Sequence, residues 1–322
     1  MNDKLDTRRL VIYLLLAFGI AWTCGLVVYL TGGLADSRVL IPGTSITLAL
    51  VLFAVGYMWA PGFANILTRL ITKEGWKNTY LRTNFRKGWP YWVAAWLLPV
   101  VLTVLGAALY FALFPEHYDP SLQAISDQLE RTTGGAVDFS PWIVVIINTT
   151  TAILIAPLVN GFFTFGEEFG WRVYLQPGLM PLGGRIAILL MGAIWGVWHW
   201  PAIAMGHNYG LNYPGYPLSG MLAMVWFTLV TGTFLGWVVI KSGSVWPAVI
   251  GHGAINGIAA IGILFVQGQP NPLLGPVPTG LIASIPWALF ALLIFLLPNA
   301  LKAPEPSQEF VEDVREDVST AQ

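Results

Sequence analysis

The chain of 322 residues is strongly apolar: hydrophobic residues make up 56% of it and charged residues only 10%. Soluble domains usually carry about 25% charged residues, because a surface that faces water must be polar. This deficit excludes an ordinary soluble domain and indicates that much of the surface faces lipid. The formal net charge of −1 gives no general attraction to nucleic acid, and a single cysteine excludes an intramolecular disulfide.

Long apolar segments predict the fold. A helix needs about 20 predominantly apolar residues to cross the hydrocarbon core of a bilayer. We therefore expect an all-α fold, a polytopic integral membrane bundle in which residues 1–302 form a single transmembrane domain. Because the first segment is long and others follow it, an uncleaved signal anchor is expected rather than a signal peptide. Eight segments meet the criterion: 10–31, 39–60, 90–114, 142–166, 186–205, 219–240, 244–267 and 279–300.

The distribution of Lys and Arg predicts the orientation. The connection 61–89 carries six basic residues and one acidic residue, whereas the connection 115–141 carries five acidic residues and one basic residue. Basic connections stay on the cytoplasmic side of a membrane. The connection 61–89 is therefore predicted to be cytoplasmic, and eight spans place both termini on that side. We expect a multi-pass protein of the plasma membrane.

Two peripheral segments have their own patterns. Residues 61–75 predict an amphipathic interfacial helix in the basic connection, with one apolar face made of Phe63, Ile66, Leu67 and Leu70. The segment 303–322 is rich in acidic residues and contains two prolines, which is typical of a disordered chain. It is predicted to be a disordered cytoplasmic tail.

Ionisable residues are rare in the predicted spans, and three short strings contain them. In the first string, Glu168 and Arg172 lie four residues apart, in the order that favours an ion pair on a helix. Glu167 points about 100° away from this pair and is a candidate general base. A charge at the bilayer centre costs about 2.5–3.5 kcal/mol, so such residues usually serve a function. The alternative, preferred for this string alone, is that all three residues cap the helix at the interface.

The second and third strings place polar groups four residues apart. Trp195 and His199 share a helix face, so the indole can pack beside the imidazole and exclude water. His252 and Asn256 also share a face, and both can donate to a developing oxyanion. Each pair has a structural alternative, in which the polar groups only bond a neighbouring helix.

Taken together, the three strings resemble the CPBP family of intramembrane proteases, which includes the type II CAAX prenyl endopeptidases of the Rce1-like or Abi group. The pattern is EExxxR, then an aromatic residue and a histidine four residues later, then HxxxN, within residues 142–270. One departure is visible, because the second motif of the family usually begins with Phe and here begins with Trp195. The resemblance implies a catalytic core in this segment, with functional residues at Glu167, Glu168, Arg172, His199, His252 and Asn256.

The resemblance implies hydrolysis of a peptide bond at the membrane. Glu167 and His199 would activate water, His252 and Asn256 would hold the oxyanion, and Glu168, Arg172 and Trp195 would support the site. Direct activation by Glu167 and His199 is the preferred mechanism. One carboxylate and two imidazoles can also ligate zinc, so Glu167, His199 and His252 are an alternative zinc site. We expect a cavity that opens toward the cytoplasm between the fourth, fifth, sixth and seventh spans.

The substrate stays open at this stage. A prenylated CAAX protein, a pheromone or bacteriocin precursor, and an unmodified membrane protein all fit, with the lipid bilayer as a partner and no nucleic acid. Two other functions compete with proteolysis: a transporter that relays protons through Glu167, His199 and His252, and a non-catalytic immunity-type membrane protein. His117 and His207 lie on predicted outer connections and are assigned no role.

Overall fold

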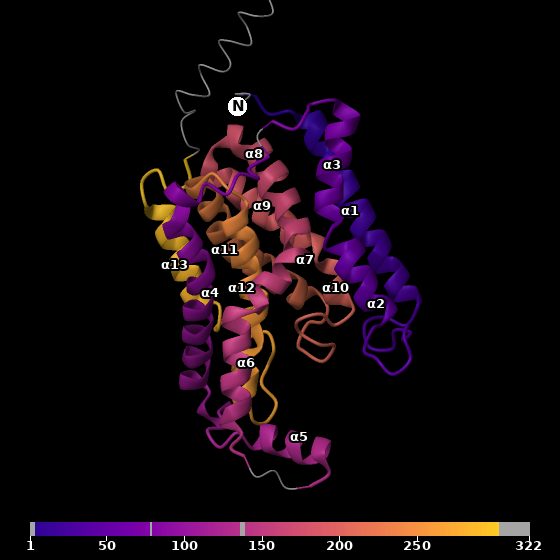
Figure 1. The fold of residues 1–322 in the computed structure, drawn as a ribbon, viewed down its shortest axis with the longest axis vertical. Helices are drawn as coiled ribbons and strands as arrows, with labels where there is room; N and C mark the ends of the chain where they lie inside the picture. The colour runs from indigo at the N-terminus through magenta and orange to yellow at the C-terminus, as the bar shows by residue number, and fades with distance from the viewer. Residues whose placement is uncertain (1–3, 78, 136–138, 303–322) are drawn as a thin grey trace, which may run out of the picture.

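The fold is helical throughout the part of the chain that the structure describes. This structure is a computed structural model that describes residues 4–77, 79–135 and 139–302, so the predicted tail 303–322 lies outside the described residues. Within these ranges there is no β-strand, only two isolated bridges, Val39 with Thr47 and Tyr118 with Val266. Most of the longer helices run along the long axis of the molecule (Figure 1). The prediction of an all-α fold is confirmed.

The helices follow one another along the chain with short irregular connections. The first half contains α1 (Thr7–Leu30), α2 (Leu48–Val51), the π-helix η1 (Leu52–Tyr57), α3 (Ala60–Thr72), α4 (Phe85–Leu113), the 3-10 helix η2 (Pro115–His117) and α5 (Gln123–Thr133). The middle contains α6 (Trp142–Leu154), α7 (Ala156–Gly170), the π-helix η3 (Trp171–Leu175), α8 (Gln176–Leu179), the 3-10 helix η4 (Met180–Leu182), α9 (Gly184–Trp198) and α10 (Trp200–Ala204). The last part contains α11 (Leu218–Ser242), α12 (Trp246–Ile258), the 3-10 helix η5 (Ala259–Phe265) and α13 (Ile285–Leu296).

The number of membrane-spanning helices differs from the predicted eight. Among the described residues, six helices are long and apolar enough to cross a bilayer, and there are seven if the pair Trp142–Leu154 and Ala156–Leu182, bent by 47°, counts as one span. The predicted last span, 279–300, contains only α13. At 1.5 Å per residue this helix is about 18 Å long, which is less than the roughly 30 Å of a hydrocarbon core.

Helix α3 packs against α1 and α7 within the bundle, whereas the sequence pattern predicts an interfacial helix. Residues Leu48–Thr72 form one apolar run long enough to span a membrane, so the predicted second span 39–60 is displaced toward the C-terminus. The predicted apolar face points away from the protein, with Phe63, Leu67 and Leu70 exposed at 37%, 39% and 58%. The face with small and polar residues is buried, including Asn65. In a lipid environment the large apolar side chains face outward, and small residues pack between helices.

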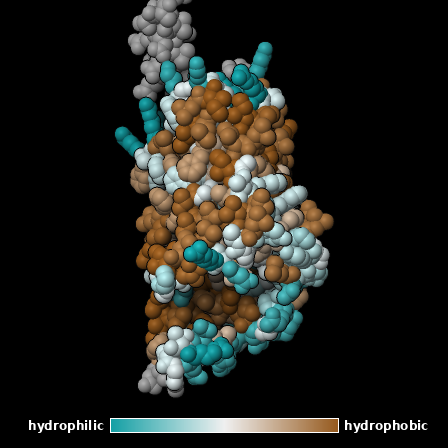
Figure 2. Space-filling model, turned by 90° about the vertical axis from the view of Figure 1, so that its right-hand side faces the viewer, coloured by the Kyte–Doolittle hydropathy of each residue, from teal (hydrophilic) through white to brown (hydrophobic). Residues whose placement is uncertain are grey.

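The outer surface is apolar over most of its height. Side chains such as Leu15, Leu30 and Leu296 are exposed at 70%, 71% and 69%. Figure 2 shows hydrophobic side chains over much of the face near α1, with hydrophilic side chains gathered at the upper end and again toward the lower end. Exposed apolar patches of this extent mark contact with a membrane. Together with the apolar helices, this surface supports a multi-pass membrane protein.

One end of the bundle, which we call the basic end, contains the start of α1, the connection 73–84 and α8 (Figure 1). The first and last described segments meet there, because Lys4 and Lys302 line the same pocket. The opposite end contains α5 and the connection 31–47. The assignment of the basic end to the cytoplasm stays a prediction.

Candidate active site

The last turn of α7 and the π-helix η3 carry the first motif. Gly166 and Gly170 face α3, and this close approach leaves no room for a side chain. A Cβ at Gly166 would lie 2.7 Å from Cα of Trp59, and a Cβ at Gly170 would overlap Pro61. The Asn65 amide of α3 donates 2.7 Å to the carbonyl of Phe169, within the region where the helix changes to π geometry. Single π turns inside helices are frequent at functional sites.

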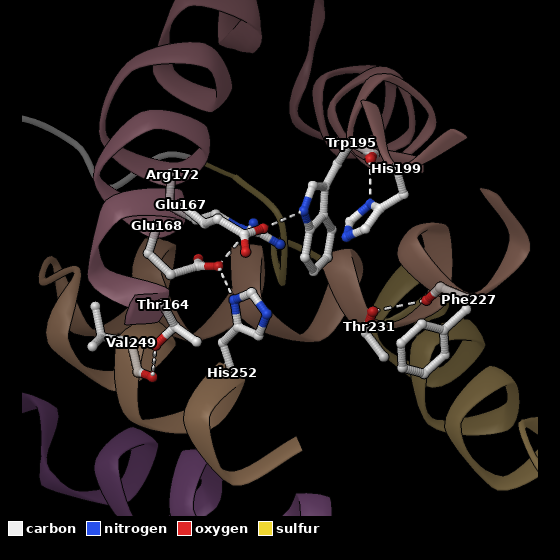
Figure 3. A network of polar contacts seen from close by, with 10 residues as sticks. All are labelled: Thr164, Glu167, Glu168, Arg172, Trp195, His199, Phe227, Thr231, Val249 and His252. Carbon is white, nitrogen blue, oxygen red and sulfur yellow. Dashed lines mark hydrogen bonds and ion pairs between the residues drawn. The ribbon is translucent and has the colours of Figure 1, made fainter. Parts of the chain in front are cut away.

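Helix α12 is fixed against α7 beside this motif. Thr164 Oγ1 donates 3.0 Å to the carbonyl of Val249, and Asn160 Nδ2 donates 3.2 Å to that of Gly253. A Cβ at Gly253 would lie 2.6 Å from the carbonyl oxygen of Pro157, so only glycine permits this helix separation. These contacts place His252 next to the glutamate pair of α7 (Figure 3).

Glu168 is the centre of a buried charge network. Its Oε1 is 3.1 Å from Arg172 Nη1 and 2.8 Å from His252 Nδ1. The side chains of Glu168 and Arg172 are completely buried. The predicted ion pair between them is confirmed, whereas the bond to His252 could not be predicted from one helix. Since a buried ion pair is costly without further hydrogen bonds, the histidine bond helps to stabilise the carboxylate.

Trp195 connects the remaining groups of the site. Its Nε1 donates 2.8 Å to Glu167 Oε2, and its carbonyl lies 2.8 Å from Nδ1 of His199 (Figure 3). The Arg172 guanidinium lies 4.5 Å from the centre of the indole ring, within the range of a cation–π contact. The predicted packing of Trp195 beside His199 is confirmed, with 5.7 Å between the ring centroids.

The hydrogen bond of His199 determines which of its nitrogens faces a reactant. A carbonyl oxygen can only accept, so Nδ1 of His199 carries the proton that it donates to Trp195. In the neutral ring, Nε2 is then an acceptor. His199 lines the cavity described next, where such a nitrogen can accept a proton from water.

A cavity of about 450 Å³ collects the predicted catalytic residues, because Glu167, Trp195, His199, His252 and Asn256 all line it. Its walls come from the predicted fourth to seventh spans, as expected. Helix α2 and the π-helix η1 add a further wall, with Leu50, Phe53, Ala54 and Tyr57. Asn256 is exposed and has no hydrogen-bond partner among the described residues, so its amide is available to a ligand.

The lining of the cavity extends beyond the catalytic residues. Beyond the site, the lining continues through Leu50 of α2, His207 and Asn208 of the connection 205–217, and Thr279. These segments lie away from the basic end, as the labels α2 and α10 in Figure 1 show. Which side of the membrane the cavity opens to stays a prediction.

His207 is a cavity residue that sequence reasoning missed. It lies three residues after α10 and lines the same cavity as His199. Desolvation by the surrounding protein lowers the pKa of His207, although the residue is exposed and water moderates this effect. No local pattern marks this residue, because its position depends on how the connection 205–217 folds.

The predicted zinc site does not fit the geometry. Among residues 4–77, 79–135 and 139–302, no three His, Cys, Asp or Glu side chains are arranged to hold a metal ion. Glu167 and His199 are each bound to Trp195, and His252 is bound to Glu168. The three proposed ligands are thus held by separate partners and do not form a ligand set.

Comparison with known proteins agrees with the resemblance seen in the sequence. Residues 140–258 match the family model described as type II CAAX prenyl endopeptidase Rce1-like, a segment that contains all three motifs. No curated protein gives a significant match to the chain. Residues 140–258 are therefore similar to the Rce1-like type II CAAX prenyl endopeptidases, and this match supports a CAAX-type intramembrane protease at the level of the family.

Proposed function

We propose that the chain hydrolyses a peptide bond of a membrane-anchored substrate, with Glu167 and His199 activating the attacking water. The observation that carries this proposal is that Trp195 holds both groups, Glu167 through its indole and His199 through its carbonyl. Both residues line the same cavity. The second carboxylate oxygen of Glu167 has no partner among the described residues and is not buried, so it can accept a proton from water.

His252 and Asn256 are proposed to stabilise the oxyanion. His252 Nδ1 is bound to Glu168, which leaves Nε2 on the cavity side. Because Nδ1 already donates its proton to the Glu168 carboxylate, a hydrogen bond from Nε2 to an oxyanion requires the imidazolium form of His252. Its Nε2–H and the free amide of Asn256 would then be two donors separated by one helical turn. Preorganised donors of this kind stabilise the negative charge of a tetrahedral intermediate.

The proposed reaction follows from these positions. A water molecule loses a proton to Glu167 while its oxygen attacks the scissile carbonyl carbon, and His199 Nε2 orients that water. The carbonyl oxygen becomes the oxyanion held by His252 and Asn256. As the carbon–nitrogen bond breaks, Glu167 passes the proton to the leaving amine, which leaves a carboxylic acid and an amine. General acid–base catalysis in such a mechanism typically accelerates the reaction by about 10²–10⁴-fold.

An apolar groove supports a lipid-modified substrate. It has a volume of about 880 Å³, and α1 and α10 line it with residues that include Phe18, Gly19, Trp22 and Pro201. Helix α10 separates it from the catalytic cavity, which Ala202 of the same helix lines. An isoprenoid chain in this groove would keep its apolar surface away from water, while the attached peptide reached the cavity.

A cleavage assay tests the proposal. The purified protein is incubated with a fluorogenic farnesylated peptide, and wild type is compared with Glu167→Gln, His199→Ala and the exposed control Glu130→Gln. We expect Glu167→Gln to lose at least about 100-fold in rate, and the control to match wild type. Because the proposed zinc ligands do not form a set, a chelator should leave the rate unchanged. Full activity of Glu167→Gln would refute the mechanism and favour a non-catalytic role.

A further inference from the structure

The break between α9 and α10 lies directly beside the proposed catalytic histidine. Helix α9 ends at Trp198, His199 follows as its C-cap residue, and α10 begins at Trp200. The last four carbonyl groups of an α-helix have no N–H partner within that helix. Pro201 has no backbone N–H, so it cannot supply one of the missing donors, and side chains from other helices have to do so.

The carbonyl of Trp198 accepts hydrogen bonds from two side chains of different helices. The Tyr57 hydroxyl of η1 donates 2.5 Å to this oxygen, and Nε1 of Trp22 in α1 donates 3.2 Å to it. Tyr57 is 2% exposed and lines the catalytic cavity, whereas Trp22 lines the apolar groove. A single carbonyl thus connects a wall of the cavity with a wall of the groove.

The ring of Tyr57 is fixed by its neighbours. Its centroid lies 4.4 Å from that of Trp198, and the ring stacks on Phe53 at 4.7 Å. Gly25 of α1 packs beside it, since a Cβ at Gly25 would lie 3.3 Å from Cβ of Pro201 and 3.5 Å from Cε2 of Tyr57. These contacts keep the hydroxyl directed at the Trp198 carbonyl.

The bonds to this carbonyl determine the orientation of His199. A peptide group is planar, so the direction of the Trp198 carbonyl also sets the direction of the His199 N–H. That N–H donates 3.1 Å to the carbonyl of Gly196, and Nδ1 of the ring donates to the carbonyl of Trp195 (Figure 3). The backbone and the ring of His199 are therefore each fixed, and loss of the donors to Trp198 would release the backbone.

We propose that Tyr57 and Trp22 are positioning residues, which hold His199 in its catalytic orientation through the carbonyl of Trp198. This inference rests on the proposed function, because it assumes that His199 orients the attacking water. Displacement of a catalytic group by about 1 Å can lower a rate by about 100-fold. Loss of both donors should therefore lower kcat and leave KM unchanged for a peptide without a farnesyl group, which does not occupy the groove.

Hydrogen exchange of residues 199–204 in detergent tests the positioning without any substrate. Tyr57→Phe removes one donor, Trp22→Phe removes the other, and the double variant removes both. We expect each single variant to speed exchange by about 2–10-fold, the effect of one hydrogen bond. The double variant should exceed the product of the two effects, because each single variant keeps the other donor on the same oxygen.

Steady-state cleavage of the fluorogenic peptide without its farnesyl group separates positioning from a general loss of structure. The double variant should lower kcat by at least about tenfold with KM unchanged. If its unfolding midpoint shows that it does not fold, Tyr57→Phe alone is used for both measurements.

The matched control is Tyr209→Phe. Tyr209 is 3% exposed, donates 3.0 Å to the carbonyl of Thr279 and does not line the cavity. This variant loses a phenol hydrogen bond of the same kind and should keep the exchange rates and the kcat of wild type. Absence of cleavage by wild type would overturn the proposed function. Normal cleavage by wild type, together with unchanged exchange or unchanged kcat in the double variant, would overturn only this inference.

Discussion

Trp195 donates a hydrogen bond of 2.8 Å to Glu167, and this bond joins the two motifs that the sequence separates by 28 residues. Phenylalanine, which is usual at this position in the family that the sequence resembles, has no N–H group and could not form it. The indole therefore does more than fill space beside His199. The indole N–H fixes one carboxylate oxygen of Glu167 and leaves the other oxygen facing the cavity.

Replacement of Trp195 by phenylalanine should lower the turnover number. The variant Trp195→Phe keeps an aromatic ring but removes the donor to Glu167. A hydrogen bond to a charged group contributes about 1.5–3 kcal/mol, so we expect kcat to fall by about 10–100-fold with little change in KM. The measurement is steady-state cleavage of a fluorogenic peptide.

The matched control is Trp226→Phe. Trp226 donates 2.9 Å to Ser284 and does not line the catalytic cavity. This variant loses an indole hydrogen bond of the same kind and should keep its activity. Equal activity of wild type and Trp195→Phe would show that the bond to Glu167 has no part in catalysis.

Replacement of each of the two adjacent glutamates by glutamine should change the unfolding midpoint to a different extent. Glu168→Gln leaves the buried Arg172 without its ion-pair partner, and breaking a buried pair costs about 3–5 kcal/mol of stability. We expect a clear fall in the unfolding midpoint, measured by tryptophan fluorescence in detergent. Glu167→Gln should change the midpoint much less, because its amide oxygen can still accept from Trp195. Equal midpoints for the two variants would contradict the network drawn in Figure 3.

The apolar groove gives a prediction about substrate choice. A Cβ at Gly19 would meet nothing within 4 Å, so Gly19→Phe adds a ring to the groove without a clash. Displacing about two methylenes of an isoprenoid, at about 0.8 kcal/mol each, should raise KM for a farnesylated peptide by about tenfold. Cleavage of the same peptide without its farnesyl group should not change.

Leu289→Phe is the control for this change, because it adds a ring at a lipid-facing position of α13 that is 61% exposed. Its KM values should match wild type for both peptides. If Gly19→Phe raises KM equally for the peptides with and without the farnesyl group, the substitution disturbs the fold and does not act through the groove.

The Asp119 carboxyl is expected to make the stability of the folded state depend on pH at the end of the bundle opposite the basic end. Hydrogen bonds from the Ser121 side chain, and from the backbone amides of Gln123 and Ser121, lower the pKa of this carboxyl. The unfolded value is about 3.9, so Asp119 stabilises the folded state fully above that pH. The stabilisation is lost as the pH falls through the lower folded pKa.

Hydrogen exchange of α5 checks this prediction, because Asp119 binds the amide of Gln123 at the start of that helix. After correction for intrinsic exchange rates, the protection of α5 in wild type should fall below about pH 4. Asp119→Asn should show weaker protection at pH 6 and no further fall on acidification. The same pH profile in both proteins would contradict the role given to the carboxylate.

Relations within one helix could be predicted from the sequence. The pairs Glu168 with Arg172 and Trp195 with His199 follow from a helical repeat of 3.6 residues, and both are present. Contacts between helices, such as His252 with Glu168, depend on helix packing and left no local signal. The same limit explains why His207 was missed.

Two differences between the sequence pattern and the structure have a common physical origin. Residues 61–75 have an amphipathic pattern, which in water means that the apolar face is buried. Around a membrane bundle the preference is reversed, and the apolar face of α3 is the exposed one. The structure gives six to seven candidate spans in its described part, against about eight predicted. The apolar composition of a segment such as 279–300 does not show that only Ile285–Leu296 is helical.

The contact between α3 and α7 limits how far this protein can be shortened. The segment that matches the family model begins at residue 140, yet Gly166 and Gly170 pack on Trp59 and Pro61, and Asn65 bonds the carbonyl of Phe169. A truncated chain beginning at residue 140 would expose this backbone to lipid, with its small residues and with a carbonyl that has lost its bond from Asn65. The N-terminal helices thus cover and support α7. A shortened protein cannot begin at the boundary that the motifs suggest.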